Sequence, residues 1–213
     1  MLEHAWYFPR ERYTLMPWRN GAGTTREIVR EPAHTEPFDW RLSLATIEAS
    51  GAFSSYPGYL RVVALVDGHG FRLDIKDARS HLLRKRGEHV LFAGAAQAAC
   101  ELLDGPCTEL SLMVREPGAI EEVAYLQVDA EQRLHIACGM LQVLFVTHGA
   151  ISCLAAPSTT GCERGSYPLH LNDTLVVRGD DSGWSLRRTA SEPAQLMAIT
   201  FSPPAPSALK SAP

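Results

Sequence analysis

Two segments of this chain, separated by about 80 residues, follow one pattern, and this repeat restricts the fold more than any other feature. Each has an apolar run, a turn that contains glycine and a second apolar run; they are VALVDGHGFRLDI (Val63 to Ile75) and VLFVTHGAISCLA (Val143 to Ala155). Each segment is followed by a second unit in which a polar turn precedes an apolar run; these units are Arg86 to Phe92 and Leu171 to Val177. A repeat of this length has the size of a domain, so the sequence predicts two similar all-β units. The alternative is two unrelated hairpins that share glycines because turns need glycine.

Short runs of alternating or β-branched residues predict further strands, and no convincing long amphipathic helix is found. The segment Glu116 to Gln132 fits a helical turn, but Val123, Tyr125 and Leu126 within it fit a strand nearly as well. The other predicted strands lie in Thr25 to Val29, Trp40 to Ala45, His89 to Gly94, Thr108 to Glu116, Asp173 to Asp180, Gly183 to Ala190 and Ala194 to Ser202.

The length of 213 residues suits one large domain or two small ones. From the repeat we expect an N-terminal unit over residues 1–118 and a C-terminal unit over residues 119–202. Residues 203–213 are rich in proline and have no periodicity, so we expect a disordered tail there.

Composition and charge exclude several classes of protein. The net charge of −4 and the lack of basic runs give no general attraction to nucleic acid or to an anionic membrane. The N-terminus lacks the apolar run of a signal peptide and no stretch is long and apolar enough for a membrane span, so we expect a cytoplasmic protein. The five cysteines are an odd number without a C-x-x-C pair. Cys100 and Cys107 flank a turn and could face each other, but reduced thiols packed as small apolar groups fit a cytoplasmic chain better.

The first third of the chain concentrates polar side chains among aromatic ones, in WRNGAGTTREI (Trp18 to Ile28), FDWRLSLA (Phe38 to Ala45) and GAFSSYPGYLR (Gly51 to Arg61). Polar groups fixed between aromatic walls are typical of a pocket for a small polar molecule. In the first block, Gly21 and Gly23 allow the backbone to approach a ligand closely. Asn20, Thr24 and Thr25 would add hydrogen-bonding groups there. The same loop is also explained as a plain glycine turn before a strand.

Alternation in the second block predicts that Arg41 and Ser43 share one face of a strand, opposite Trp40, Leu42 and Leu44. Arginine is the usual bidentate partner of a carboxylate, and Arg61 is a second candidate for that role. We therefore expect an anion-binding site whose polar residues are accompanied by aromatic walls. The predicted ligand-binding residues are Trp18, Asn20, Gly21, Gly23, Thr24, Arg41, Ser43, Tyr56 and Arg61.

Patterns typical of catalytic or metal sites are missing from the sequence. The eight histidines show neither H-x-H nor H-x-x-x-H spacing, so no metal site and no cofactor is predicted, although a set assembled from distant strands would leave no local pattern. No phosphate-binding loop or nucleophile motif occurs. Glu27, Glu48 and Asp39 are the candidates for an acid or base, but the sequence does not pair them. We therefore predict no catalytic residues.

The blocks WRNGAGTTREI, FDWRLSLATI, GAFSSYPGYLR and VDGHGF, in this order, resemble the HutD/Ves family of bacterial proteins, and a later block, LDGPCTELSLMVRE (Leu103 to Glu116), does so too. The resemblance covers most of the chain. It implies an all-β, cupin-like fold, a jelly-roll double β-barrel (bicupin) in which the two expected units would be related cupins. It also implies a cytoplasmic protein without established catalysis, linked in some members to histidine utilisation and in others to stress responses.

The chain departs from the family pattern at two places. Ala22 replaces the middle one of three glycines, and Glu109, Leu110 and Ser111 stand where the family typically has Asp-Phe-Asn. Loss of an amide from a pocket would change its hydrogen bonding to a ligand, because an unmatched polar group costs roughly 1–3 kcal/mol. The metal-binding motifs of cupins are also missing.

From these observations we expect a non-catalytic, metal-independent bicupin that binds a small anionic metabolite in its N-terminal half. The resemblance implies an intermediate of histidine breakdown, such as a formylated or free amino dicarboxylate, sensed in a regulatory role. One alternative is a cupin hydrolase or isomerase with Glu27 or Glu48 as base. Another is a protein-interaction module with a vestigial pocket. Edge strands make a homodimer reasonable.

Overall fold

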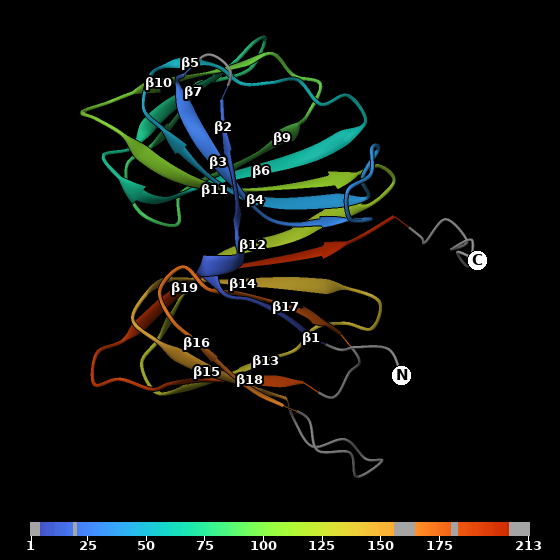
Figure 1. Cartoon of the computed structure of the whole chain (residues 1–213), viewed down its shortest axis with the longest axis vertical. Coiled ribbons are helices and arrows are strands. Elements are labelled where there is room, and N and C mark those ends of the chain that lie inside the picture. The colour runs from blue at the N-terminus through green and yellow to red at the C-terminus, as the bar shows by residue number, and fades with distance from the viewer. Residues whose placement is uncertain (1–4, 19–20, 156–164, 180–182, 205–213) are drawn as a thin grey trace.

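The computed structural model describes residues 5–18, 21–155, 165–179 and 183–204. Within them the chain is almost entirely β, with one short 3₁₀ helix, η1 (Arg10–Arg12). The strands form four sheets stacked along the long axis of the molecule, which we number I to IV from the end that contains β5 and β10 (Figure 1). No helix in these residues is long and apolar enough to cross a membrane.

Residues 14–115 build sheets I and II. Sheet I has the order β5-β10-β7-β8, and sheet II has the order β2-β3-β4-β11-β6-β9. The strands of sheet I are β5 (Gly51–Ala52), β10 (Ala98–Leu102), β7 (Phe71–Ile75) and β8 (His81–Leu83). Those of sheet II are β2 (Thr14–Pro17), β3 (Gly23–Glu31), β4 (Trp40–Ile47), β11 (Cys107–Arg115), β6 (Tyr59–Gly68) and β9 (His89–Ala93).

The second half of the chain, together with the N-terminal strand β1, builds sheets III and IV, with the orders β1-β17-β14-β19-β12 and β13-β18-β15-β16. The strands of sheet III are β1 (Ala5–Phe8), β17 (Thr174–Arg178), β14 (Leu141–His148), β19 (Ala194–Ser202) and β12 (Ala119–Val128). Those of sheet IV are β13 (Glu131–Leu134), β18 (Trp184–Arg188), β15 (Ile151–Ala155) and β16 (Ser166–Leu169). The segment Glu116 to Gln132, for which the sequence allows a helical turn or a strand, contains the strand β12, which pairs along its length with β19.

The strand orders of the two halves correspond element by element. The run β4-β11-β6-β9 of sheet II matches β12-β19-β14-β17 of sheet III, and β5-β10-β7-β8 matches β13-β18-β15-β16. The repeated segments of the sequence are β6 with β7 and β14 with β15, so they occupy matching places. The sequence similarity thus reflects a repeat of topology and is more than shared turn chemistry.

Alternation along the central strands divides the core into three layers. In β6, Val62, Ala64 and Val66 face sheet III, whereas Val63 and Leu65 face sheet I. Because both faces of this strand are buried, it is apolar almost throughout. Sheets II and III share the largest core cluster, sheets I and II a second one and sheets III and IV a third.

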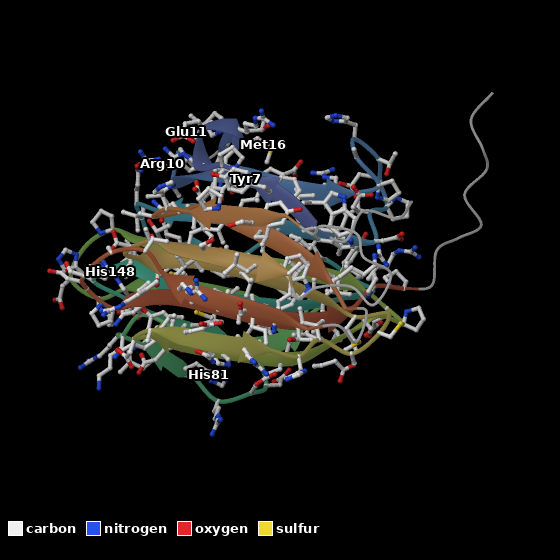
Figure 2. All side chains as sticks on the ribbon, turned by 90° about the horizontal axis from the view of Figure 1, so that it is seen from below. Tyr7, Arg10, Glu11, Met16, His81 and His148 are labelled. Atoms are coloured by element: carbon white, nitrogen blue, oxygen red, sulfur yellow. The ribbon has the colours of Figure 1, made fainter. Side chains whose placement is uncertain are left out.

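The N-terminal segment ties the two halves together. β1 joins sheet III by pairing with β17, and β2 joins sheet II by pairing with β3. Buried Asp173 accepts hydrogen bonds from the Tyr7 hydroxyl (2.8 Å) and the Arg10 backbone N–H (3.1 Å). Figure 2 shows Tyr7, Arg10 and Met16 along one edge of the molecule, opposite His81. This segment brings β2 to the cavity described below.

Candidate functional site

A cavity of about 480 Å³ lies between sheets I and II. Its size falls within the usual range for small-molecule sites. Strands β4, β6 and β11 supply polar side chains, while β2 and the segment after β5 supply aromatic and apolar ones. The lining residues are Met16, Pro17, Trp18, Thr25, Arg41, Ser43, Ala45, Ala52, Phe53, Ser54, Tyr56, Arg61, Glu109 and Met113.

The register of sheet II gathers the polar side chains on one face. Ser43 of β4 lies opposite Ser111 of β11, and Met113 of β11 lies opposite Arg41 on one side and Arg61 on the other. Because side chains alternate along each strand, these residues share the face toward sheet I, whereas Leu42 and its neighbours pack into the core against sheet III. The face of sheet II toward sheet III is thus apolar, and its packing in the core fixes the strands that carry the polar side chains.

Arg41 is buried and shares its carboxylate partner with another arginine. Its Nε lies 2.7 Å from Glu27 Oε2, yet the atoms are not aligned for a hydrogen bond, and Arg41 donates none to the described part of the chain. Glu27 Oε2 instead accepts two hydrogen bonds from Arg30, which also contacts Glu36. Arg41 is therefore a cation at the cavity with unused hydrogen-bond donors.

Arg61 is held by aromatic rings and by two polar partners. Its guanidinium carbon lies 4.6 Å from the centre of the Phe53 ring and 5.7 Å from that of Phe92. Its Nε donates to Ser111 Oγ at 3.2 Å, and a terminal nitrogen lies 3.7 Å from Glu109 Oε1. Stacked and hydrogen-bonded guanidinium groups are fixed in orientation, so Arg61 is pre-organised.

Glu109 is the third charged group in the cavity lining. Its side chain is 3% exposed, and within the described part of the chain its Oε2 has no hydrogen-bond partner. Burial raises the pKa of Glu109 to about 7, against the opposing influence of Arg61 and Arg41. A buried carboxyl group with a free oxygen and a pKa near neutrality is the kind of group that exchanges protons in functional sites.

Trp18 forms a wall that the glycine loop positions. Its indole Nε1 donates to Thr25 Oγ1 at 2.8 Å. The Gly21 N–H donates to the Trp18 carbonyl, and the Trp18 N–H donates to the Gly23 carbonyl, which closes a tight turn. Gly21 has a positive φ of 68°, which glycine adopts without strain.

Gly23 is expected to be sensitive to substitution for steric reasons. A Cβ there would lie 2.3 Å from the Thr46 carbonyl oxygen and 3.2 Å from the Trp18 ring. We predict that Gly23→Ala lowers the free energy of unfolding by about 1–3 kcal/mol, as overpacking generally does, and displaces Trp18. Denaturant unfolding with tryptophan fluorescence would measure both effects. The control is Gly51→Ala, where a Cβ meets nothing within 4 Å; equal losses in the two variants would contradict the prediction.

The structure brings together five of the predicted ligand-binding residues at the cavity: Trp18, Arg41, Ser43, Tyr56 and Arg61. Gly21, Gly23 and Thr24 lie beside Trp18 but are not among the lining residues, and Asn20 lies outside the described residues. Whether any of them contacts a ligand remains a prediction. Of the candidate bases, Glu27 contacts Arg30 and Arg41 and is not among the lining residues, and Glu48 is exposed and does not line the cavity either.

The sequence interpretation missed Glu109 as a site residue and treated it only as part of a departure from a family pattern. A usable signal was present. In TELSLMVRE, Leu110, Leu112 and Val114 form one face, so Glu109 and Ser111 had to share the other. The position of that face, opposite Arg41 and Arg61, depends on pairing between strands far apart in the sequence.

No described histidine or cysteine lines the cavity. Over residues 5–18, 21–155, 165–179 and 183–204, no group of three or more His, Cys, Asp or Glu side chains is arranged to hold a metal ion. Cys100, Cys107 and Cys153 are buried free thiols, and burial raises the pKa of each to about 12. Such thiols are unreactive and act as small apolar groups, while Cys162 lies outside the described residues.

A family model described as HutD matches residues 10–198, which include every lining residue of the cavity. The chain belongs to the HutD family. A 21.2 kDa protein of Pseudomonas putida, described as uncharacterised and lying in the hutC 3′ region, is 39% identical over 102 residues. Protein Ves of Citrobacter koseri is 39% identical over 110 residues. These matches cover 47% and 51% of this chain and 53% and 57% of the relatives, so the chain spans little more than half the length of the curated relatives that it matches.

Solved structures support the family assignment over nearly the whole chain. The conserved protein of unknown function PA5104 from Pseudomonas aeruginosa superimposes with a TM-score of 0.80 at 30% identity, and HutD from Pseudomonas fluorescens with 0.74 at 26%. Both matches cover 94% of this chain and 100% of the other. Oxalate decarboxylase of Lactobacillus farciminis gives a TM-score of 0.70 at 10% identity, covering 96% of this chain and 87% of the other. At this low identity the likeness concerns the fold alone. Together with the strand topology, it shows that this HutD family member is all-β and cupin-like.

Proposed function

We propose that this HutD family protein is a metal-independent bicupin that binds a small carboxylate in the cavity between sheets I and II and acts as a sensor without turnover. The observation that carries the proposal is the pair of buried arginines, of which Arg41 has unused donors and Arg61 is pre-organised. Arginine binds carboxylates in bidentate fashion, and the aromatic walls would exclude water from that contact.

The two-unit description also belongs to this proposal. Its support is the matching strand order of the two halves, with residues 14–115 and 119–202 forming corresponding pairs of sheets. On the corresponding face of the second unit, the polar side chain is a neutral amide instead of an arginine. Gln142 of β14 shares a face with Leu144 and Val146, just as Arg61 of β6 shares a face with Val63 and Leu65, and Gln142 donates to Thr200 Oγ1. The anion site is therefore assigned to the N-terminal unit only.

The family and the name of the P. putida relative support a metabolite connected with histidine utilisation. A formylated or free amino dicarboxylate carries the carboxylate that the arginines would bind. The test is isothermal titration calorimetry with N-formyl-L-glutamate, L-glutamate, glutarate and acetate. Binding of at least one of them to the intact protein is expected, and silence from all four would contradict the proposal.

Arg41→Ala is expected to weaken binding of the carboxylate. Replacement by alanine removes the cation with unused donors, and hydrogen bonds to charged groups contribute about 1.5–3 kcal/mol, so we expect the Kd for the carboxylate to rise roughly 10- to 150-fold. Titration calorimetry measures this change. The control is Arg72→Ala, which removes an exposed arginine that pairs with Asp74 and Glu101 outside the cavity. Unchanged affinity in Arg41→Ala would remove the central claim.

One observation favours a second candidate, an enzyme with a glutamate base. Glu109, rather than Glu27 or Glu48, has the burial, the free oxygen and the raised pKa that general acid–base catalysis uses. Chemical conversion of a bound carboxylate, lost in Glu109→Gln while binding persists, would support this candidate over the sensor.

A further inference from the structure

The two arginines that line the cavity each face one glutamate. Arg41 contacts Glu27, Arg61 faces Glu109, and Arg30 joins Glu27 to Glu36, which is exposed to solvent. With every group ionised, Glu27 and Glu109 offset the two arginines of the cavity. A carboxylate that enters would therefore add an uncompensated negative charge to a largely buried site, which is unfavourable.

Glu109 is the group best placed to remove this excess charge. Arginine does not give up its proton in proteins, so the balance changes only when a carboxylate is protonated. Glu27 Oε2 already accepts two hydrogen bonds from Arg30 and lies beside Arg41, so this oxygen is fully engaged with arginines. Among the described residues Glu109 has one arginine within ion-pair distance, Arg61 at 3.7 Å, and its buried Oε2 has no hydrogen-bond partner there.

We infer that carboxylate binding takes up one proton, which is held on Glu109. Protonation frees Arg61 to pair with the incoming carboxylate, and the new O–H on Oε2 gains a hydrogen-bond acceptor in the ligand. The O–H bond of Glu109 is the one bond that forms and breaks: the solvent supplies the proton on binding and receives it on release. The inference rests on the proposed function and adds to it that affinity depends on pH.

Other groups near Glu109 do not compete for this proton. The thiols of Cys107 and Cys100 have pKa values raised to about 12 by burial and stay neutral through the range of interest. Burial raises the pKa of Glu109 itself to about 7, which places the exchange near neutral pH. The charged and titratable groups that interact with Glu109 are Arg61, Arg41, Cys100 and Cys107. Those that interact with its partner Arg61 are Glu109, Tyr56 and Arg41.

The experiment is titration calorimetry of the intact protein with acetate, glutarate and N-formyl-L-glutamate between pH 6 and pH 8.5. Carboxyl groups of this kind are ionised throughout that range, because their pKa values lie near 4. At pH 8, repetition in buffers with different enthalpies of ionisation gives the number of protons taken up. We expect about one proton per carboxylate bound and a Kd that rises about tenfold per pH unit above pH 7.

Two variants sharpen the test. Glu109→Gln carries a neutral group of the same shape, so it should bind with no proton uptake and, at pH 8, about tenfold more tightly than the wild type. Glu101→Gln makes the same chemical change at an exposed residue of β10 outside the cavity and should keep the pH dependence of the wild type.

The outcomes separate this inference from the function on which it rests. Binding without proton uptake in the wild-type protein overturns the inference and leaves the carboxylate site standing, and that measurement needs no variant to fold. Absence of binding at every pH overturns both. A Glu109→Gln protein that keeps the wild-type pH dependence would show that another group takes up the proton and would also overturn the assignment.

Discussion

Arg61→Ala is expected to lower the free energy of unfolding by about 3–5 kcal/mol at pH 8, the cost of removing one partner of a buried ion pair. Arg61 and Glu109 are 8% and 3% exposed, so the carboxylate that remains would have lost its nearest cation without gaining water. The stacking of the guanidinium on Phe53 and Phe92 would be lost as well. Urea unfolding followed by circular dichroism would measure the change.

The loss should depend on pH, and its sign follows from the raised pKa of Glu109. The folded-state pKa of about 7 lies above the ordinary 4.5, so the folded state binds this proton more tightly than the unfolded chain does. The stabilisation from protonated Glu109 is therefore complete below pH 4.5 and is lost as the pH rises through 7. Removing Arg61 raises the pKa further, so the stability difference from the wild type should be largest at pH 8 and smaller at pH 5.

Two variants distinguish the charge effect from simple loss of packing. In Arg61→Ala with Glu109→Gln, the buried charge is gone, so much of the stability lost at pH 8 should return. Arg72→Ala removes an exposed ion pair and should change stability by less than about 0.5 kcal/mol. A loss in Arg61→Ala that is equal at pH 5 and pH 8 would contradict the electrostatic explanation.

The sequence predicts the local part of this site well. Alternation in WRLSLA places Arg41 and Ser43 on one face of a strand, and β4 has that arrangement. The repeat likewise predicts two similar sets of strands, because β6 with β7 and β14 with β15 both consist of two apolar runs joined by a glycine turn. Such features depend on residues within a few positions of one another.

Features that depend on distant residues could not be predicted from local patterns. Glu109 becomes important because β11 lies between β4 and β6, which brings it near Arg61 and Arg41. The pairing of β1 with β17 crosses most of the chain. The packing role of Gly23, the close approach of the Thr46 carbonyl, likewise depends on a distant strand, while its predicted ligand contact stays a prediction.

The second large effect is expected for the core between sheets II and III. Phe145 of β14 is fully buried there, among residues of both halves of the chain, including Leu112 of β11 and Phe201 of β19. Phe145→Ala should lower the free energy of unfolding by about 3–5 kcal/mol, because it loses the transfer energy of the ring and leaves a void. Exposed Leu91 provides the control, and Leu91→Ala should have little effect.

This prediction also tests whether the two halves unfold together. The shared core includes Trp40 of β4, whereas Trp184 of β18 belongs to the core between sheets III and IV, so tryptophan fluorescence reports on both halves and circular dichroism on all strands. If the shared core couples the halves, both signals should show one transition at the same denaturant concentration, shifted equally by Phe145→Ala. Separate midpoints, with only one of them shifted, would mean that each pair of sheets is stable alone and that the core between sheets II and III contributes little.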